Sequence, residues 1–150
     1  MAESNIPARW PAYCRVPPFL PVPLRARADG WTPRRQAEFI GFLAETGSVT
    51  EAAQRVGMSR VAAYRLRRCR NSVSFVYAWD AVLAARNGTQ IPARKVTFGE
   101  LYVSAMEGPL TVQMRGGRFL RTSQKPSDTA ALRFLKRFGT RSLRRRGRRA

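Results

Sequence analysis

The chain has 150 residues, with 28 Lys+Arg against 9 Asp+Glu and no His, so its formal net charge is +19. One ordinary domain, or a small core with tails, fits this length, and 44% hydrophobic residues can supply the core. Without His, with two cysteines and with scattered carboxylates, the chain lacks the residues of a catalytic triad, a Cys/His zinc site or a two-metal nuclease, so we expect no enzyme, no cofactor and no metal.

Residues 1–30 are rich in proline, which fixes φ and disfavours helix in the preceding residue. We expect a disordered arm, which either docks its interleaved aromatic residues loosely on the domain or binds a partner or DNA. This segment has many prolines and lacks the apolar stretch of a signal peptide. No apolar run in the sequence approaches the roughly 18 residues that span a bilayer. We therefore expect a cytoplasmic protein that makes no membrane contact.

Helical signals begin after Trp31. Thr32 is a good N-cap, Pro33 suits the first helical position, and apolar residues then recur at helical spacing until Gly47. The pattern predicts a helix over about 33–46.

Two short helices follow, separated by a tight turn. Thr50 is predicted to cap a helix that ends at Val56, Gly57 suits a left-handed turn position, and Ser59 is predicted to cap a helix at about 60–70. Helices joined so tightly can cross only where small residues face each other, and Ala52, Ala53 and Ala63 meet this need. The core beneath them is expected to contain Val56, Met58 and Leu66. The spacing is typical of a helix-turn-helix.

The second of these helices carries many arginines and no acidic residue, as a DNA recognition helix would. We expect base-edge contacts from Ser59, Arg60, Val61 and Tyr64, with Arg65 behind them. We expect phosphate contacts from Arg67, Arg68 and Arg70. The alternative is a solvated basic helix in an unrelated helical bundle.

Ser72 is predicted to cap a helix over 73–86, followed by a linker at 89–96. The helix has an apolar stripe that either completes the core or forms a subunit interface; it comprises Phe75, Ala78, Trp79, Val82 and Leu83.

Region 97–138 changes its hydrophobic period. Thr97 is predicted to cap a short helix, two β-prone runs around Gly116-Gly117 predict a hairpin, and Ser127 is predicted to cap a last helix. An isolated hairpin must pack on something, and the candidates are the helices before and after it or another subunit. The expected buried face of the last helix is Leu132, Leu135 and Phe138, with Ala131 and Phe134.

Residues 139–150 form an arginine-rich tail that is too charged to fold alone. It is either a solubilising tail or a nucleic-acid arm with phosphate contacts from Arg144, Arg145, Arg146, Arg148 and Arg149. The expected fold is mainly α: a helix-turn-helix domain over 31–88, then a helix, hairpin and helix that oligomerise or bind a partner, between a disordered Pro-rich arm and the tail.

The segment from Trp31-Thr-Pro-Arg-Arg-Gln to Ala-Tyr-Arg-Leu-Arg-Arg resembles the N-terminal helix-turn-helix of phage and prophage terminase small subunits, in the form found in alphaproteobacterial genomes. The resemblance covers about residues 31–86. It implies recognition of viral DNA for packaging, assembly as a homo-oligomeric ring and delivery of DNA to a large ATPase-nuclease subunit. It supports Ser59, Arg60, Tyr64 and Arg65 as DNA-facing residues.

The main hypothesis is therefore a double-stranded DNA-binding protein with a packaging role. The same signature occurs in transcriptional regulators, which is the first alternative. The second is an RNA-binding basic protein whose arginine-rich tail orders on its target.

Overall fold

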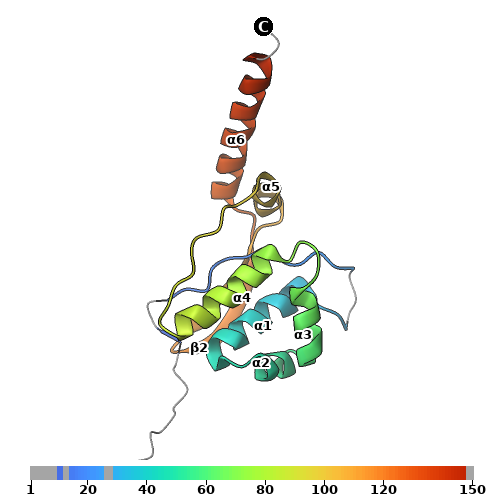
Figure 1. Ribbon diagram of the computed structural model, residues 1–150, viewed down its shortest axis with the longest axis vertical. Helices are drawn as coiled ribbons and strands as arrows, with labels where there is room; N and C mark the ends of the chain where they lie inside the picture. The colour runs from blue at the N-terminus through green and yellow to red at the C-terminus, as the bar shows by residue number, and fades with distance from the viewer. Residues whose placement is uncertain (1–9, 12–13, 26–28, 148–150) are drawn as a thin grey trace, which may run out of the picture. The chain divides into compact units, whose positions relative to one another are not determined.

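In the computed structural model, described for residues 10–11, 14–25 and 29–147 with side chains to Gly139, the chain forms six helices and one antiparallel hairpin (Figure 1). The elements are α1 (Pro33–Thr46), α2 (Val49–Arg55), α3 (Arg60–Arg67), α4 (Val73–Arg86), α5 (Phe98–Met106), β1 (Leu110–Arg115), β2 (Arg118–Gln124) and α6 (Asp128–Gly147). The predicted mainly helical fold with a hairpin and a C-terminal helix is confirmed.

The chain divides into two compact units. The first contains the residues up to Ala93 together with Leu110–Ser123, and the second contains Arg94–Pro109 and the residues from Gln124 onward. The hairpin thus belongs with the helix-turn-helix, and its grouping with α5 and α6 in region 97–138 was wrong.

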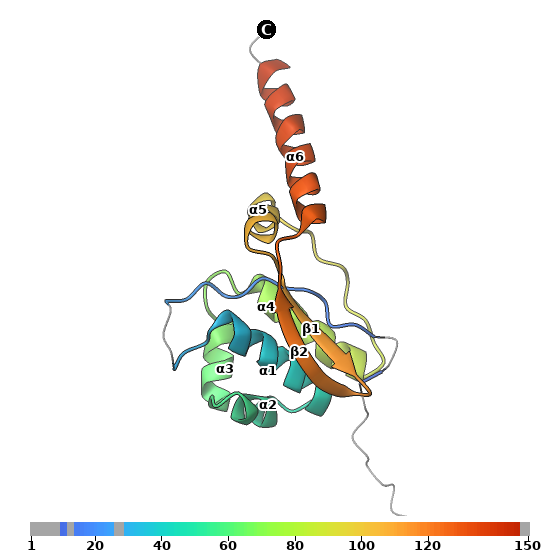
Figure 2. The same ribbon diagram turned by 180° about the vertical axis from the view of Figure 1, so that it is seen from behind.

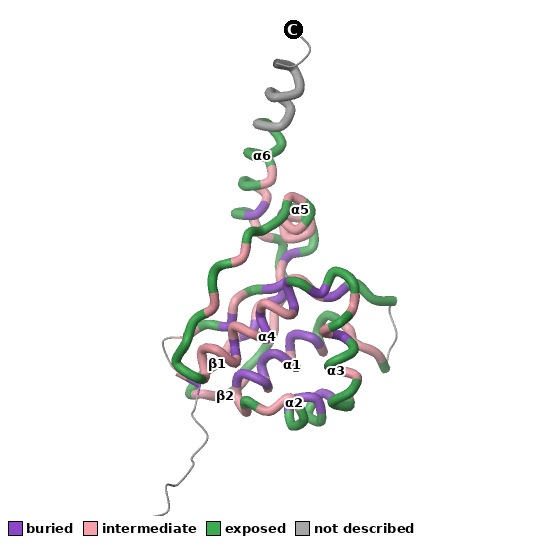
Figure 3. Tube along the Cα trace, viewed as in Figure 1, coloured by how far each residue is buried: buried purple, intermediate pink, exposed green. Residues whose placement is uncertain are grey.

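Helix α1 is the centre of the first unit. The Thr32 hydroxyl accepts a hydrogen bond from the backbone N–H of Arg35, Pro33 opens the helix, and Gly47 ends it in a left-handed conformation with φ of 70°, as predicted. The helix lies between α4 and the hairpin (Figure 2), and buried positions are gathered along it (Figure 3). Helix α1 therefore contacts α2, α4 and the hairpin, and α3 packs on α2.

The described part of the proline-rich arm is packed into this core, so the prediction of a disordered arm is wrong for it. We call residues 14–25 the strap. Its buried side chains are Val16, Phe19 and Val22, one at every third position, and Trp10 upstream is also buried. Three residues per turn is the period of the extended helix that proline favours, so one face of such a segment can be continuously apolar.

Gln36 fastens the strap to α1. Its side chain is fully buried; Oε1 accepts from the backbone N–H of Val22 at 2.7 Å, and Nε2 donates to the carbonyls of Val22 at 3.1 Å and Trp31 at 3.2 Å. The amide thus supplies the hydrogen bonds that a neighbouring strand would give to an extended segment.

Three further hydrogen bonds tie the strap to other elements. Phe19 and Leu110 exchange backbone hydrogen bonds as an antiparallel bridge, and the N–H of Leu20 donates to the hydroxyl of Ser74 on α4 at 2.8 Å. The strap therefore joins α1, α4 and the hairpin.

The hairpin turns at Gly116 and Gly117, whose positive φ angles of 59° and 80° suit a tight two-residue turn. Its inner face packs on α1: the rings of Phe119 and Phe42 lie 5.0 Å apart, and a Cβ added at Gly41 would overlap Phe119. Helix α1, which precedes the hairpin by more than 60 residues, is thus its packing partner.

The second unit pairs α5 with α6. Thr97 and Glu100 form a reciprocal capping box at the start of α5, and Phe98 stacks on Phe134 of α6 with ring centroids 4.5 Å apart. Ser127 caps α6 by accepting from the N–H of Ala130. Both predicted caps are confirmed.

The predicted buried face of α6 is wrong for its three main residues, since Leu132, Leu135 and Phe138 are 69%, 62% and 57% exposed. Ala131 and Phe134 are half-buried, and Ala130 is buried. At 100° per residue, the apolar residues span a wide arc of which α5 covers one side. The other side is open in this single chain.

Helix α6 also continues beyond its predicted end at Phe138, reaching Gly147. The predicted tail contacts of Arg144, Arg145 and Arg146 lie on this helical backbone, but their side chains lie outside the described residues, as do Arg148 and Arg149 entirely.

We predict that Gln36→Ala lowers the free energy of unfolding by about 2–4 kcal/mol, because it leaves both backbone groups of Val22 buried without partners. Urea unfolding followed by circular dichroism measures the change. Gln54→Ala, the same replacement at an exposed position of α2, should change stability by less than about 0.5 kcal/mol. Equal effects of the two substitutions would rule out the anchoring role of Gln36.

Candidate nucleic-acid interface

The turn between α2 and α3 is fixed by local hydrogen bonds. Gly57 has a φ of 77°, the N–H of Met58 donates to the carbonyl of Ala53 at 2.9 Å, and the Ser59 hydroxyl accepts from the N–H of Ala62 at 3.0 Å. The predicted roles of Gly57 and Ser59 are confirmed. The first helix differs in its cap: Ser48, and not Thr50, accepts from the N–H of Glu51.

Small side chains let α2 and α3 cross closely, as predicted. Ala52, Ala53 and Ala63 have no exposed surface, and Leu66 is 2% exposed beneath them. Helix α3 thus packs closely through Ala63 and Leu66 and leaves its opposite side to solvent.

The outward face of α3 carries most of the predicted DNA contacts. At 100° per residue, with Ala63 and Leu66 inward, the opposite arc holds the side chains that are exposed. These are Arg60, Val61, Tyr64, Arg65 and Arg68, and Ser59 and Arg70 at the two ends of the helix are exposed as well. The helix itself ends at Arg67, three residues before its predicted end, and Arg68–Arg70 form a turn.

Arg67 was predicted to contact phosphate, and the structure gives it another role. Its Nη2 lies 3.0 Å from a carboxylate oxygen of Asp80, and its guanidinium carbon lies 5.1 Å from the centre of the Trp79 ring. The angular position of Arg67 on α3 lies toward α4, where both partners are. This arginine therefore fastens α3 to α4 and is committed within the fold.

Trp79 of α4 packs against α3 through Tyr64 and Arg67. It is 3% exposed, and its ring centroid lies 5.4 Å from that of Tyr64. Tyr64 stays 36% exposed, and the guanidinium of Arg60 lies 5.5 Å above its ring. The contact with Trp79 restricts the ring of Tyr64, and the contact with this ring restricts Arg60. Both side chains would therefore lose less conformational entropy on binding a ligand.

Trp79 belongs to the apolar stripe of α4, which lies in the core. Phe75, Ala78 and Val82 are fully buried and Leu83 packs against them, so the stripe completes the core and does not form a subunit interface. Ser72 stands at the N-cap position but makes no capping bond; its hydroxyl donates to the carbonyl of Arg67 at 2.8 Å. This hydrogen bond links the end of α3 to the start of α4.

Five acidic side chains form ion pairs with arginines that lie away from the outward face of α3. These pairs are Arg34–Glu38, Arg55–Glu45, Arg55–Glu51, Arg67–Asp80 and Arg94–Glu100. Among the described residues, no carboxylate lies within 4.0 Å of Arg60, Arg65, Arg68 or Arg70. The exposed face of α3 thus keeps its positive charge and can attract a polyanion.

Arg86, unlike the exposed arginines of α3, makes hydrogen bonds within the protein. Its Nη1 donates to the carbonyls of Ala44 and Glu45 at the end of α1, where the helix dipole favours a cation. Burial lowers the pKa of Arg86, but a guanidinium remains protonated in proteins. It serves the fold and is not a surface charge for a ligand.

The described part of the chain has neither a cluster of possible metal ligands nor a membrane-spanning helix. No group of three or more His, Cys, Asp or Glu side chains is placed to hold a metal ion there. Its helices also include none with the length and apolar character required to cross a membrane.

Sequence reasoning missed the structural residues around the site. Gln36, the strap and the paired state of Arg67 were not foreseen; the three-residue spacing of Val16, Phe19 and Val22 was the signal available for the strap.

A scan against protein-family models, a search of curated proteins and a search of solved structures each gave no match for this chain.

We predict that Arg67→Ala lowers the free energy of unfolding by about 1 kcal/mol, because it removes a partly exposed ion pair and a cation–π contact. Arg68→Ala, on the exposed face one residue later, should leave stability within about 0.5 kcal/mol of the parent chain. Thermal unfolding measured for both variants compares the two arginines. Loss of stability from Arg68→Ala alone would contradict the assignment.

Proposed function

We propose that this protein binds double-stranded DNA through α3, which enters the major groove as the recognition helix of a helix-turn-helix. The observation that carries the proposal is the outward face of α3, where exposed arginines without acidic partners surround Tyr64 on a rigidly mounted helix. An α-helix fits the width of the major groove, and arginine can form paired hydrogen bonds to guanine.

The residues on this face divide by position. Ser59, Arg60, Val61 and Tyr64 lie at the start of α3 and are proposed to meet base edges, with Arg65 behind them. Arg68 and Arg70 lie at its end and are proposed to bind phosphates, while Arg67 leaves this set because Asp80 and Trp79 hold it.

A packaging role like that of the terminase small subunits that the sequence resembles is the biological function we propose. In this role the protein would mark viral DNA and present it to a large terminase subunit. Transcriptional regulation by the same kind of contact is the competing function. The two differ in assembly, since a ring of many subunits fits packaging and a dimer fits regulation.

We predict different effects of two arginine substitutions on DNA binding. Arg60→Ala should reduce the preference for the target over other sequences, by about 1–3 kcal/mol, because a base contact is lost. Arg68→Ala should weaken all sequences alike and reduce the slope of log affinity against log salt by about 0.9, because one phosphate contact is lost. Selection from random DNA fragments, followed by competition binding at several salt concentrations, gives both quantities. The same loss of preference in both variants would refute this division of roles.

We also propose that copies of the chain associate through the open face of α6, which displays Leu132, Leu135 and Phe138. A second copy multiplies the modest affinity of one small module through effective concentration.

The double substitution Leu132→Gln/Leu135→Gln is predicted to yield monomers, because it removes apolar surface and keeps good helix formers. Sedimentation velocity measures the mass of the assembly. Leu120→Gln, at a 54% exposed hairpin position, should leave the mass unchanged. A parent chain that sediments as a monomer, or a double variant that keeps its assembly, would contradict the proposal.

A further inference from the structure

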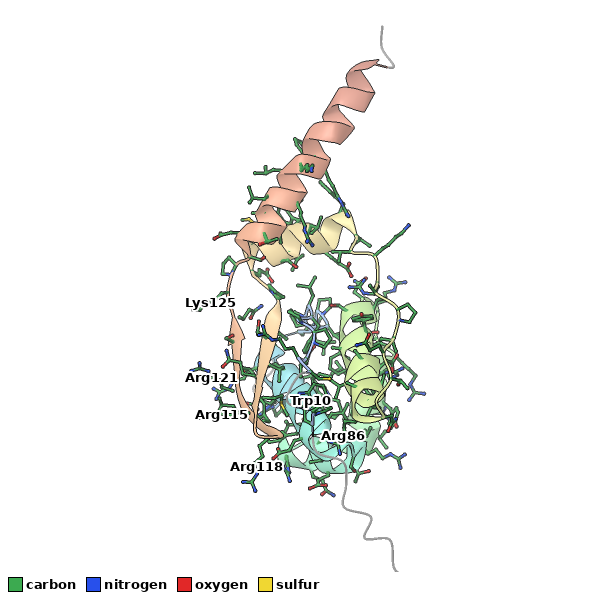
Figure 4. All side chains as sticks on the ribbon, turned by 90° about the vertical axis from the view of Figure 1, so that its left-hand side faces the viewer. Trp10, Arg86, Arg115, Arg118, Arg121 and Lys125 are labelled. Carbon is green, nitrogen blue, oxygen red and sulfur yellow. The ribbon has the colours of Figure 1, made fainter. Side chains whose placement is uncertain are left out.

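A second basic surface lies on the hairpin. Arg115 and Arg118 flank the Gly116-Gly117 turn, Arg121 follows on β2, and all three are exposed. Figure 4 shows them on the outer side of the hairpin, directed away from α1. We call these three residues the hairpin arginines.

The hairpin arginines are not neutralised by the protein. No carboxylate of the described residues lies within 4.0 Å of any of them, and Arg121 donates from Nε to the side-chain oxygen of Gln113 at 2.6 Å. Like charges brought together across a hairpin are destabilising. Their concentration at this tip therefore contributes nothing evident to folding and favours an anionic ligand.

The hairpin is also held firmly enough to act as a preformed contact. Phe119 packs against Phe42 and Gly41, Val112 is 6% exposed, and Leu110 pairs with Phe19 of the strap. Its anchor is α1, which also packs against α2 of the helix-turn-helix. Binding through the tip would therefore require little ordering of the backbone.

We propose that the hairpin arginines bind the phosphate backbone of the same DNA duplex that α3 reads, at a separate stretch of the backbone. This inference rests on the proposed function of α3. Figures 1 and 2 show the hairpin and α3 apart, with α1 between them. A duplex presents one phosphate charge per roughly 1.7 Å along its axis, so a second basic element can meet phosphates beyond those beside the recognition helix.

The test compares Arg115→Ala/Arg118→Ala with Arg25→Ala/Lys95→Ala. The second variant also removes two positive charges without an acidic partner, at exposed positions outside α3 and the hairpin. Binding to a duplex selected by the parent chain is followed by fluorescence anisotropy from low to physiological salt. The hairpin variant should lower the slope of log affinity against log salt by about 1.8, and the control variant by much less.

Hydroxyl-radical footprinting of the same complexes locates the contact. The parent chain should protect two separate stretches of backbone. The hairpin variant should keep protection where α3 binds and lose the second stretch, which a general loss of folding would not produce. Thermal unfolding should match that of the parent chain because both replaced side chains are exposed.

The outcomes separate the two proposals. A parent chain that binds no duplex refutes the function proposed for α3. A parent chain that binds duplex while the hairpin variant keeps both its salt slope and its footprint refutes the hairpin proposal alone. A hairpin variant whose only defect is in binding a structured RNA hairpin, tested under the same conditions, or whose effect equals that of the control variant, also overturns it.

Discussion

The hydrogen bonds between Gln36 and Val22 are the contact on which the first unit depends. A buried amide must find partners, and here one side chain satisfies the N–H and the carbonyl of an extended segment that has no complete sheet to join. This holds the strap in place, so that Phe19 reaches the core between α4 and the hairpin. A proline-rich segment that sequence composition assigns to a flexible arm thereby becomes a central part of the fold.

From the strap, aromatic contacts continue to the proposed DNA-binding helix. Phe19 packs edge-on against Phe75, Phe75 against Trp79, and Trp79 against Tyr64, with ring centroids 5.4–5.9 Å apart. Such contacts prefer particular ring orientations, and a densely packed core changes shape little. The direction in which α3 presents its side chains is therefore set by packing that begins more than 40 residues earlier in the chain.

The distribution of charge follows from the small number of acidic residues. With 28 basic and 9 acidic residues, most arginines cannot be paired, and the carboxylates that do form pairs neutralise arginines of the framework such as Arg55 and Arg67. Among the described side chains, arginines without an acidic partner gather on α3 with the turn after it and on the hairpin, which belong to the same unit. A folded chain of this charge repels itself, and a bound polyanion would relieve that repulsion.

The sequence alone determined the elements whose signals are local. The N-cap of α1, the left-handed turn at Gly57 and the capping box at Thr97 each involve a few neighbouring residues, whose hydrogen bonds and φ angles depend little on the rest of the chain. Tertiary structure decided the partner of each apolar or charged side chain: it buried the strap, placed Arg67 against Asp80 and left one side of α6 open. Periodicity shows that a helix has an apolar face, but the segment that covers this face can come from anywhere in the chain, and only the folded core selects it.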